Sequence, residues 1–188
     1  MNHLLITGLP GVGKTTLLQR ALEQLKNVPA TGFVTEEVRQ SGDRVGFDVV
    51  TLTGGRAPLA RVGTGGGRSR PCVGRYAVDL ESFERVALSA MASAPSGGVL
   101  VIDEIGKMEL LSAPFQRSVR AAFAGGAAVI VATVPVARGR QPALLAELRS
   151  RPDIRLLEVT RQNREALVQT VVDFVLKRLG NGGGAVPD

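Results

Sequence analysis

The glycine-rich stretch at residues 8–15, GLPGVGKT, constrains the fold of this 188-residue chain more than any other feature. It fits G-x-x-x-x-G-K-[ST], a loop that binds phosphate groups through its backbone N–H groups and its lysine. Such a loop must turn sharply and aim a helix N-terminus at the phosphates, so it requires a strand before it and a helix after it. Both are indicated: residues 3–7 form a short apolar run, and apolar residues recur at helical spacing after the loop.

Each residue type in the loop has a physical reason. Glycines lack a β-carbon, so the backbone can bring its amides within hydrogen-bonding distance of phosphate oxygens. Lys14 is a compact cation expected to bridge the β- and γ-phosphates, and the Thr15 hydroxyl is expected to bind the accompanying Mg²⁺. The predicted site for a nucleoside triphosphate therefore comprises Gly8, Leu9, Pro10, Gly11, Val12, Gly13, Lys14, Thr15 and Thr16.

A second segment supplies acidic groups. Residues 99–104, VLVIDE, place four apolar residues before two carboxylates, as in a central parallel strand whose carboxyl end opens into a ligand crevice. Asp103 is the expected outer partner of the magnesium ion. Glu104 should point to a different side and is the candidate general base; a helix-capping or salt-bridging carboxylate is the alternative.

Further candidates are less specific. Thr133 ends the next predicted strand, where it either senses the γ-phosphate or is satisfied by backbone. Four cations are candidates for stabilising developing charge, although for each one taken alone a surface position is the favoured interpretation: Lys107, Arg138, Arg140 and Arg164.

The pattern as a whole predicts an α/β fold of three layers: a mostly parallel central sheet with helices on both faces. Residues 31–80 alternate apolar with polar residues between glycine-rich turns, which is typical of antiparallel hairpins. We expect these hairpins to extend one edge of the sheet, with residues 63–70 as a flexible loop and several arginines near the phosphate site. An extra strand is expected between the two motif strands.

Later elements follow from periodicity and capping signals. Helices are predicted for residues 79–94, after Ser112, for residues 142–149 and from residue 163 to residue 180; strands are predicted for residues 127–133 and 155–159. Residues 1–179 are interpreted as a single domain, and residues 180–188 as a disordered tail.

Composition narrows the functional classes. The chain is 44% hydrophobic and 21% charged, with a formal charge of +6, so a polyanionic ligand is compatible. Cys72 is the only cysteine, which excludes an intrachain disulfide. No secretory leader is apparent, and the apolar runs are far shorter than the ~20 residues that cross a bilayer. We therefore expect a cytoplasmic protein without membrane contact, with a nuclear or organellar share left open. We also expect it to be a monomer.

Several segments together resemble one known family. The stretches GLPGVGKTT, GFVTEEVR, GFDVVTL and above all VIDEIGKMEL are similar to the cancer-related nucleoside-triphosphatase family, which is related to small thermophile NTPases. The resemblance implies slow, magnesium-dependent hydrolysis of nucleoside 5′-triphosphates with broad base tolerance. It also implies phosphate binding by residues 8–15, catalysis by Glu104 with Lys14, and a second nucleotide-contacting segment: Val99, Leu100, Val101, Ile102, Asp103, Glu104, Ile105 and Gly106.

Three other functions compete with hydrolysis. A GTPase switch would explain the D-x-x-G at residues 103–106, but no N-K-x-D follows, so guanine selectivity is unsupported. A nucleotide or nucleoside kinase shares the same loop and is the stronger enzymatic rival. A nucleotide-dependent RNA- or protein-binding module suits the basic charge, yet with one tyrosine and no tryptophan the chain lacks the aromatic residues of stacking platforms.

Overall fold

The computed structural model describes residues 1–63, 70–125 and 128–180. The strands are β1 (His3–Gly8), β2 (Ala30–Gln40), β3 (Asp43–Thr51), β4 (Arg56–Val62), β5 (Cys72–Val73), β6 (Tyr76–Val78), β7 (Val99–Ile102), β8 (Val129–Pro135) and β9 (Ile154–Glu158). The helices are α1 (Lys14–Gln24), α2 (Leu80–Ala92), α3 (Ala113–Gly125), α4 (Ala143–Ser150) and α5 (Arg164–Gly180), with a short 3-10 turn, η1 (Glu109–Leu111).

All of these strands join one sheet in the order β5-β6-β4-β3-β2-β7-β8-β1-β9. The five from β2 to β9 are mutually parallel, and β8 lies between β7 and β1. The predicted extra strand between the two motif strands is therefore confirmed. Because parallel strands end at the same edge, the loops that follow β1, β7 and β8 meet there.

The antiparallel extension, which we define as β3, β4, β5 and β6, continues the sheet beyond β2. The predicted boundary at about residue 31 was wrong, because β2 belongs to both parts. Its residues 30–33 pair in parallel with β7, and residues 33–40 pair antiparallel with β3. Alternating polarity indicates a strand but not the direction of its neighbour, so the sequence could not separate the two parts.

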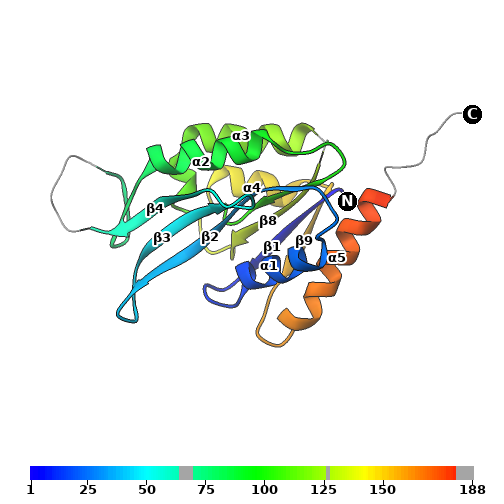
Figure 1. Ribbon diagram of the computed structural model, residues 1–188, viewed down its shortest axis with the longest axis horizontal. Helices are drawn as coiled ribbons and strands as arrows, with labels where there is room; N and C mark the ends of the chain where they lie inside the picture. Colours follow the sequence, from blue (N-terminus) through cyan, green and yellow to red (C-terminus); the bar gives the residue numbers. More distant parts are fainter. Residues whose placement is uncertain (64–69, 126–127, 181–188) are drawn as a thin grey trace, which may run out of the picture.

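Helices cover both faces of the sheet, which confirms the three-layer prediction (Figure 1). One face packs against α2, α3 and α4, with Phe33, Phe83 and Phe115 in mutual ring contact at its centre. The opposite face packs against α1 and α5 through a second apolar cluster. Burial on both faces explains why β7 reads as an unbroken apolar run.

Side chains cap two of the helices, and the cap at Ser112 confirms the prediction made for it. The Asp79 carboxylate accepts from the Ser82 amide (3.1 Å) at the start of α2, and the Ser112 hydroxyl accepts from the Phe115 amide (3.0 Å) at the start of α3. Two other predictions fall mostly outside the described residues: of the flexible loop predicted for residues 63–70 the structure does not describe residues 64–69, and of the tail predicted for residues 180–188 it describes only Gly180, the last residue of α5. Among the described helices, none combines the length and apolar character needed to cross a membrane.

Candidate functional site

The glycine-rich loop connects β1 to α1 as predicted, and two glycines show why no other residue fits. At Gly8 a β-carbon would lie 2.6 Å from the carbonyl oxygen of Val159, far closer than atoms approach without a shift of backbone. Gly13 has φ 106° and is the N-cap of α1. That backbone conformation is rare for residues with a side chain, and without a side chain Gly13 leaves the first amides of α1 uncapped. The loop thus presents free N–H groups and the positive end of a helix.

Lys14 lies within this loop and is 9% exposed. Its ammonium group donates to the carbonyl oxygens of Gly8 (3.0 Å) and Leu9 (3.4 Å). The cation is therefore held over the loop by groups that carry no charge, so it remains available to an anion.

Asp103 is the point where the two motifs meet. The Thr15 hydroxyl donates to Asp103 Oδ2 at 2.7 Å, and the Thr133 hydroxyl donates to the other carboxylate oxygen. The Thr35 amide adds a longer bond of 3.4 Å to Oδ2. Asp103 is 1% exposed, and burial raises its pKa although these donors and the charge of Lys14 oppose the shift. A bound cation would therefore favour the ionised form of Asp103.

Glu104 lines the largest hollow beside the loop, a cleft of about 940 Å³. Burial raises the pKa of the half-buried Glu104 carboxyl; the nearby charge of Lys14 lowers it, and the charge of Asp103 raises it further. The side chain thus faces the same space as Lys14 and Thr15, as predicted from its place one residue after Asp103.

Glu109 is a buried acidic residue that sequence reasoning did not single out. It is 4% exposed, and its carboxylate accepts from the Gly106 amide at 3.1 Å. A β-carbon on Gly106 would lie 3.0 Å from Glu109 Oε2 and 3.2 Å from Glu104 Oε1, so both carboxylates pack against this glycine. Burial raises the pKa of Glu109 to about 8. Its place three residues after Gly106 is visible in the sequence, but burial is not.

The structure separates the four candidate cations. Lys107 lines the cleft, whereas Arg164 lines a smaller hollow of about 160 Å³ at the start of α1. Arg138 and Arg140 are exposed in the loop after β8, outside both hollows. Of the described arginines in residues 31–80, only Arg44 reaches the cleft.

Other predicted residues lie beneath the site or are used differently. The side chains of Val99, Leu100, Val101, Ile102 and Ile105 are at most 1% exposed, so they position the acidic pair from within the core. Thr133 was predicted to sense phosphate or bond to backbone; instead it is fully buried and donates to Asp103. Thr35 from β2, which was not predicted, also donates to Asp103.

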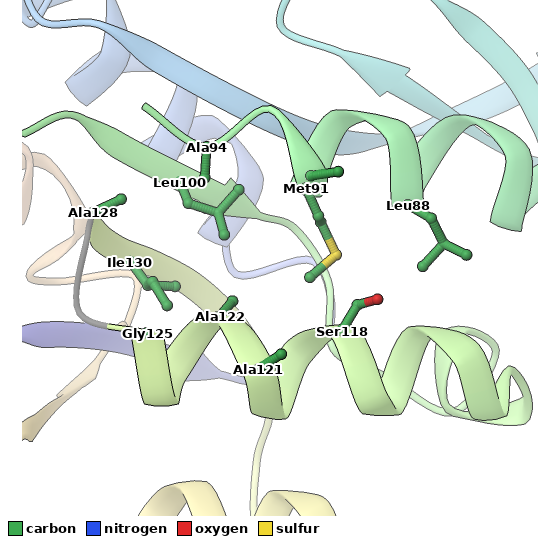
Figure 2. Close-up of a pocket in the computed structure, with 11 residues that line it drawn as sticks. Leu88, Met91, Ala94, Leu100, Ser118, Ala121, Ala122, Gly125, Ala128 and Ile130 are labelled. Atoms are coloured by element: carbon green, nitrogen blue, oxygen red, sulfur yellow. The ribbon is translucent and has the colours of Figure 1, made fainter. Parts of the chain in front are cut away.

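A third hollow, shown in Figure 2, differs from these two in chemistry and position. It has a volume of about 250 Å³ and is walled by apolar side chains of α2 and α3, including Leu88, Met91 and Ala122. Leu100 and Ile130 approach it from the starts of β7 and β8, the opposite ends from Asp103 and Thr133. It is therefore remote from the polar groups that could support catalysis.

Comparison with known proteins agrees with this geometry. The sequence model of the NTPase family matches residues 3–172. The human protein described as a cancer-related nucleoside-triphosphatase is 48% identical over 182 residues, covering 92% of this chain and 96% of its own length.

Two solved structures share the fold over nearly the whole chain. The solution structure of a human cancer-related nucleoside triphosphatase superposes with a TM-score of 0.84 at 47% identity, covering 94% of this chain and 98% of that one. The crystal structure of THEP1 from the hyperthermophile Aquifex aeolicus gives 0.81 at 35% identity, covering 92% and 98%. The chain therefore belongs to the NTPase family.

Proposed function

We propose that this protein hydrolyses nucleoside 5′-triphosphates to the diphosphate and phosphate, with Mg²⁺ as the metal and broad tolerance of the base. The observation that carries the proposal is the 2.7 Å hydrogen bond between Thr15 and Asp103. It joins the first turn of the loop helix to the acidic strand end, so both motifs face one polyphosphate. The names of the relatives, which describe nucleoside-triphosphatases, support the same reaction.

The loop and Lys14 are assigned to phosphate binding. Uncapped amides at the start of α1 complement phosphate oxygens, and a desolvated ammonium group adds a charge-assisted hydrogen bond. The carbonyls of Gly8 and Leu9 hold Lys14 in place before the ligand arrives, so little rearrangement of the side chain is needed.

Thr15 and Asp103 fit a magnesium ion. Mg²⁺ prefers oxygen ligands and is commonly held by one or two carboxylates together with substrate phosphates and water. The buried Asp103 carboxylate has hydroxyl and amide donors around it, and a divalent cation would offset its cost of burial. When bound, the metal would neutralise charge on the terminal phosphates.

Glu104 is assigned as the general base. It shares the cleft with Lys14 and Thr15, which supports a position for its carboxylate beside the terminal phosphate. A water molecule there would attack the γ-phosphorus and give its proton to Glu104 as the bond to the leaving diphosphate breaks. A raised pKa brings the carboxylate closer to the basicity that proton transfer near neutral pH requires.

The nucleobase is assigned to the opposite end of the loop. If the terminal phosphate faces Glu104, the ribose and base extend toward the smaller hollow formed by Gly13, Thr16, Leu17, Arg20, Arg164 and Glu165. Arg164 is 47% exposed there, and an arginine plane stacks on any base. Such a platform supports broad base tolerance.

Initial rates with ATP, GTP, CTP, UTP and their deoxy forms test this proposal. We expect phosphate release from all of them, at rates that differ little between bases, and loss of release when EDTA removes the metal. Release from a single nucleotide would overturn the base tolerance. The absence of release from every triphosphate, in protein that binds them, would overturn hydrolysis.

A nucleotide or nucleoside kinase is the second candidate, because the cleft continues past Glu104 to a wall built by the antiparallel extension. In that reaction an acceptor hydroxyl would replace water. Supplying γ-labelled ATP with nucleosides or nucleoside monophosphates distinguishes the two, since the label ends either on free phosphate or on the acceptor.

A further inference from the structure

The far end of the cleft is made by a different part of the chain from the phosphate loop. We define the extension wall as Arg44 and Phe47 on β3, together with Val73, Gly74 and Tyr76 around β5 and β6. Lys107 and Met108 line the same cleft after Glu104. Glu104 therefore lies in a space bounded by the loop on one side and by the extension wall on another.

The triphosphate assigned above does not require this wall. With its terminal phosphate at Glu104 and its base toward Arg164, the nucleotide uses the loop and the start of α1. The extension wall then borders space that this nucleotide leaves free. This step rests on the proposed function.

The wall combines aromatic rings with a cation. Phe47 and Tyr76 meet edge to face with ring centres 5.2 Å apart, and the Arg44 guanidinium lies 5.2 Å from the centre of the Phe47 ring. Aromatic rings and arginine planes are the groups on which nucleobases stack, and arginine also binds phosphate. Lys107, which is exposed, adds a second cation at the cleft.

The wall is also held in place before any ligand arrives. Arg44 donates to the Tyr76 hydroxyl (3.0 Å) and to the Glu37 carboxylate (2.9 Å), and Arg75 donates to the same hydroxyl (3.2 Å). Arg44 has further N–H donors beyond these two bonds, so an anion can bind without breaking them. Groups fixed on strands in this way suit a preformed binding site.

We propose that the extension wall and Lys107 form a subsite for a nucleoside monophosphate, occupied while the loop holds a triphosphate. The base packs against Phe47 and Val73, and the phosphate meets Arg44 and Lys107. The Glu37 carboxylate, which also lines the cleft, can accept from a donor of the base.

Calorimetry on the protein saturated with Mg²⁺ and a non-hydrolysable ATP analogue tests the subsite. We expect AMP and UMP each to bind one further site, and inorganic phosphate to bind at least about tenfold more weakly because it cannot stack. No uptake of AMP or UMP by the loaded protein, or phosphate binding as tight as theirs, would overturn the proposal. The nucleotide in the subsite could also be the end of a nucleic-acid chain, and a short oligonucleotide bearing a 3′-phosphate distinguishes this source. If the loaded protein binds the oligonucleotide but neither AMP nor UMP, a site for free nucleotides is overturned.

Two substitutions and a matched control locate the binding. Phe47→Ala is expected to lower the affinity for AMP by about 5- to 100-fold, and Phe47→Leu, which preserves packing, should lower it by less. Arg44→Gln should weaken it about tenfold. Arg39→Gln is the control, because Arg39 pairs with the same Glu37 but does not line the cleft. Equal effects of Arg39→Gln and Arg44→Gln would contradict the assignment.

Binding of the ATP analogue is measured first on every variant. Failure of the proposed function would appear at that stage, as loss of analogue binding or of phosphate release by the unmodified protein. Failure of the subsite would appear as a loaded, hydrolytically active protein that takes up no monophosphate.

Discussion

The parallel part of the sheet and its antiparallel extension hold their acidic groups in opposite ways. In the extension, Asp48 is paired with Arg56 (2.8 Å) and Arg61 (2.5 Å). Burial alone would raise the pKa of Asp48, but the hydrogen bonds from these arginines outweigh it and lower the pKa. In the parallel part, Asp103 is held by hydroxyls and an amide, and its pKa is raised.

This difference shows which part leaves a buried carboxylate available to a cation. A buried carboxylate with a cationic neighbour is already compensated, so it contributes to the fold and has little need of a further cation. A buried carboxylate with only neutral donors remains costly until a cation arrives. We therefore expect the acidic groups after β7 to act in ligand chemistry, whereas Asp48 of the extension mainly holds strands together. Substitutions in the two parts should differ accordingly.

The largest effect is expected from Glu104→Gln, which removes the assigned base while preserving its shape. Phosphate release should fall by about 10² to 10⁴-fold, and triphosphate affinity should be retained. Initial rates and calorimetric titration measure the two quantities. Glu147→Gln, at a surface carboxylate paired with Arg120, serves as the control and should release phosphate normally. Normal release by the Glu104 variant would remove this residue from the mechanism.

Lys14→Ala should mainly weaken the binding of the triphosphate. The loss of charge-assisted contacts, worth roughly 1.5 to 3 kcal/mol each, weakens triphosphate affinity by about 10- to 150-fold. Titration with a non-hydrolysable analogue measures it, with the exposed Lys26→Ala as the matched change of charge. If Lys26→Ala reduced affinity as much, the effect would be one of net charge and not of the loop.

Thr133→Val tests the neutral donors around Asp103. The substitution removes a hydrogen bond to a buried carboxylate, so the free energy of unfolding should fall by about 1.5 to 3 kcal/mol. Urea denaturation measures this change. Thr53→Val, at an exposed threonine after β3, should change it little, and similar losses at both positions would remove the contrast between the two parts.

Glu109→Gln tests the cost of a buried acid through pH. Because burial raises the pKa of Glu109 to about 8, the folded protein keeps a proton that the unfolded chain releases near pH 4.5. Unfolding free energy is therefore lost between these pH values, by at most about 1.4 kcal/mol per pH unit from this group.

The glutamine variant carries no such proton and can still accept from the Gly106 amide. Its stability relative to the unmodified protein should therefore increase from pH 5 to pH 8 in urea denaturation. A constant difference between the two proteins across this range would mean that Glu109 titrates normally.

The smallest effect is expected from Arg39→Gln, in the part of β2 that pairs with the extension. Arg39 is 57% exposed and pairs with Glu37, which keeps Arg44 as a partner. Exposed ion pairs contribute about 0 to 1 kcal/mol, so unfolding free energy and phosphate release should both stay near the unmodified values. A loss comparable to that of Thr133→Val would show that the junction between β2 and the extension depends on its exposed charges as strongly as the parallel part depends on its buried hydrogen bonds.

Sequence alone determined the features that local patterns encode. The glycine spacing before Lys14, the apolar run that ends at Asp103 and the cap at Ser112 each depend on a few neighbouring residues, and each appears in the structure as predicted. These features can be predicted because loop turns, buried strands and helix ends each require particular residue types within a short segment of the chain.

Tertiary structure decided which distant groups share a site. Thr35 and Thr133 converge on Asp103 because β2 and β8 flank β7, and Phe47 and Tyr76 reach the cleft because the extension pairs antiparallel beyond β2. Neither the double pairing of β2, parallel to β7 and antiparallel to β3, nor the burial of Glu109 can be seen in the local sequence. Both depend on which strands lie side by side, and that is set by the packing of the whole sheet and not by any single segment.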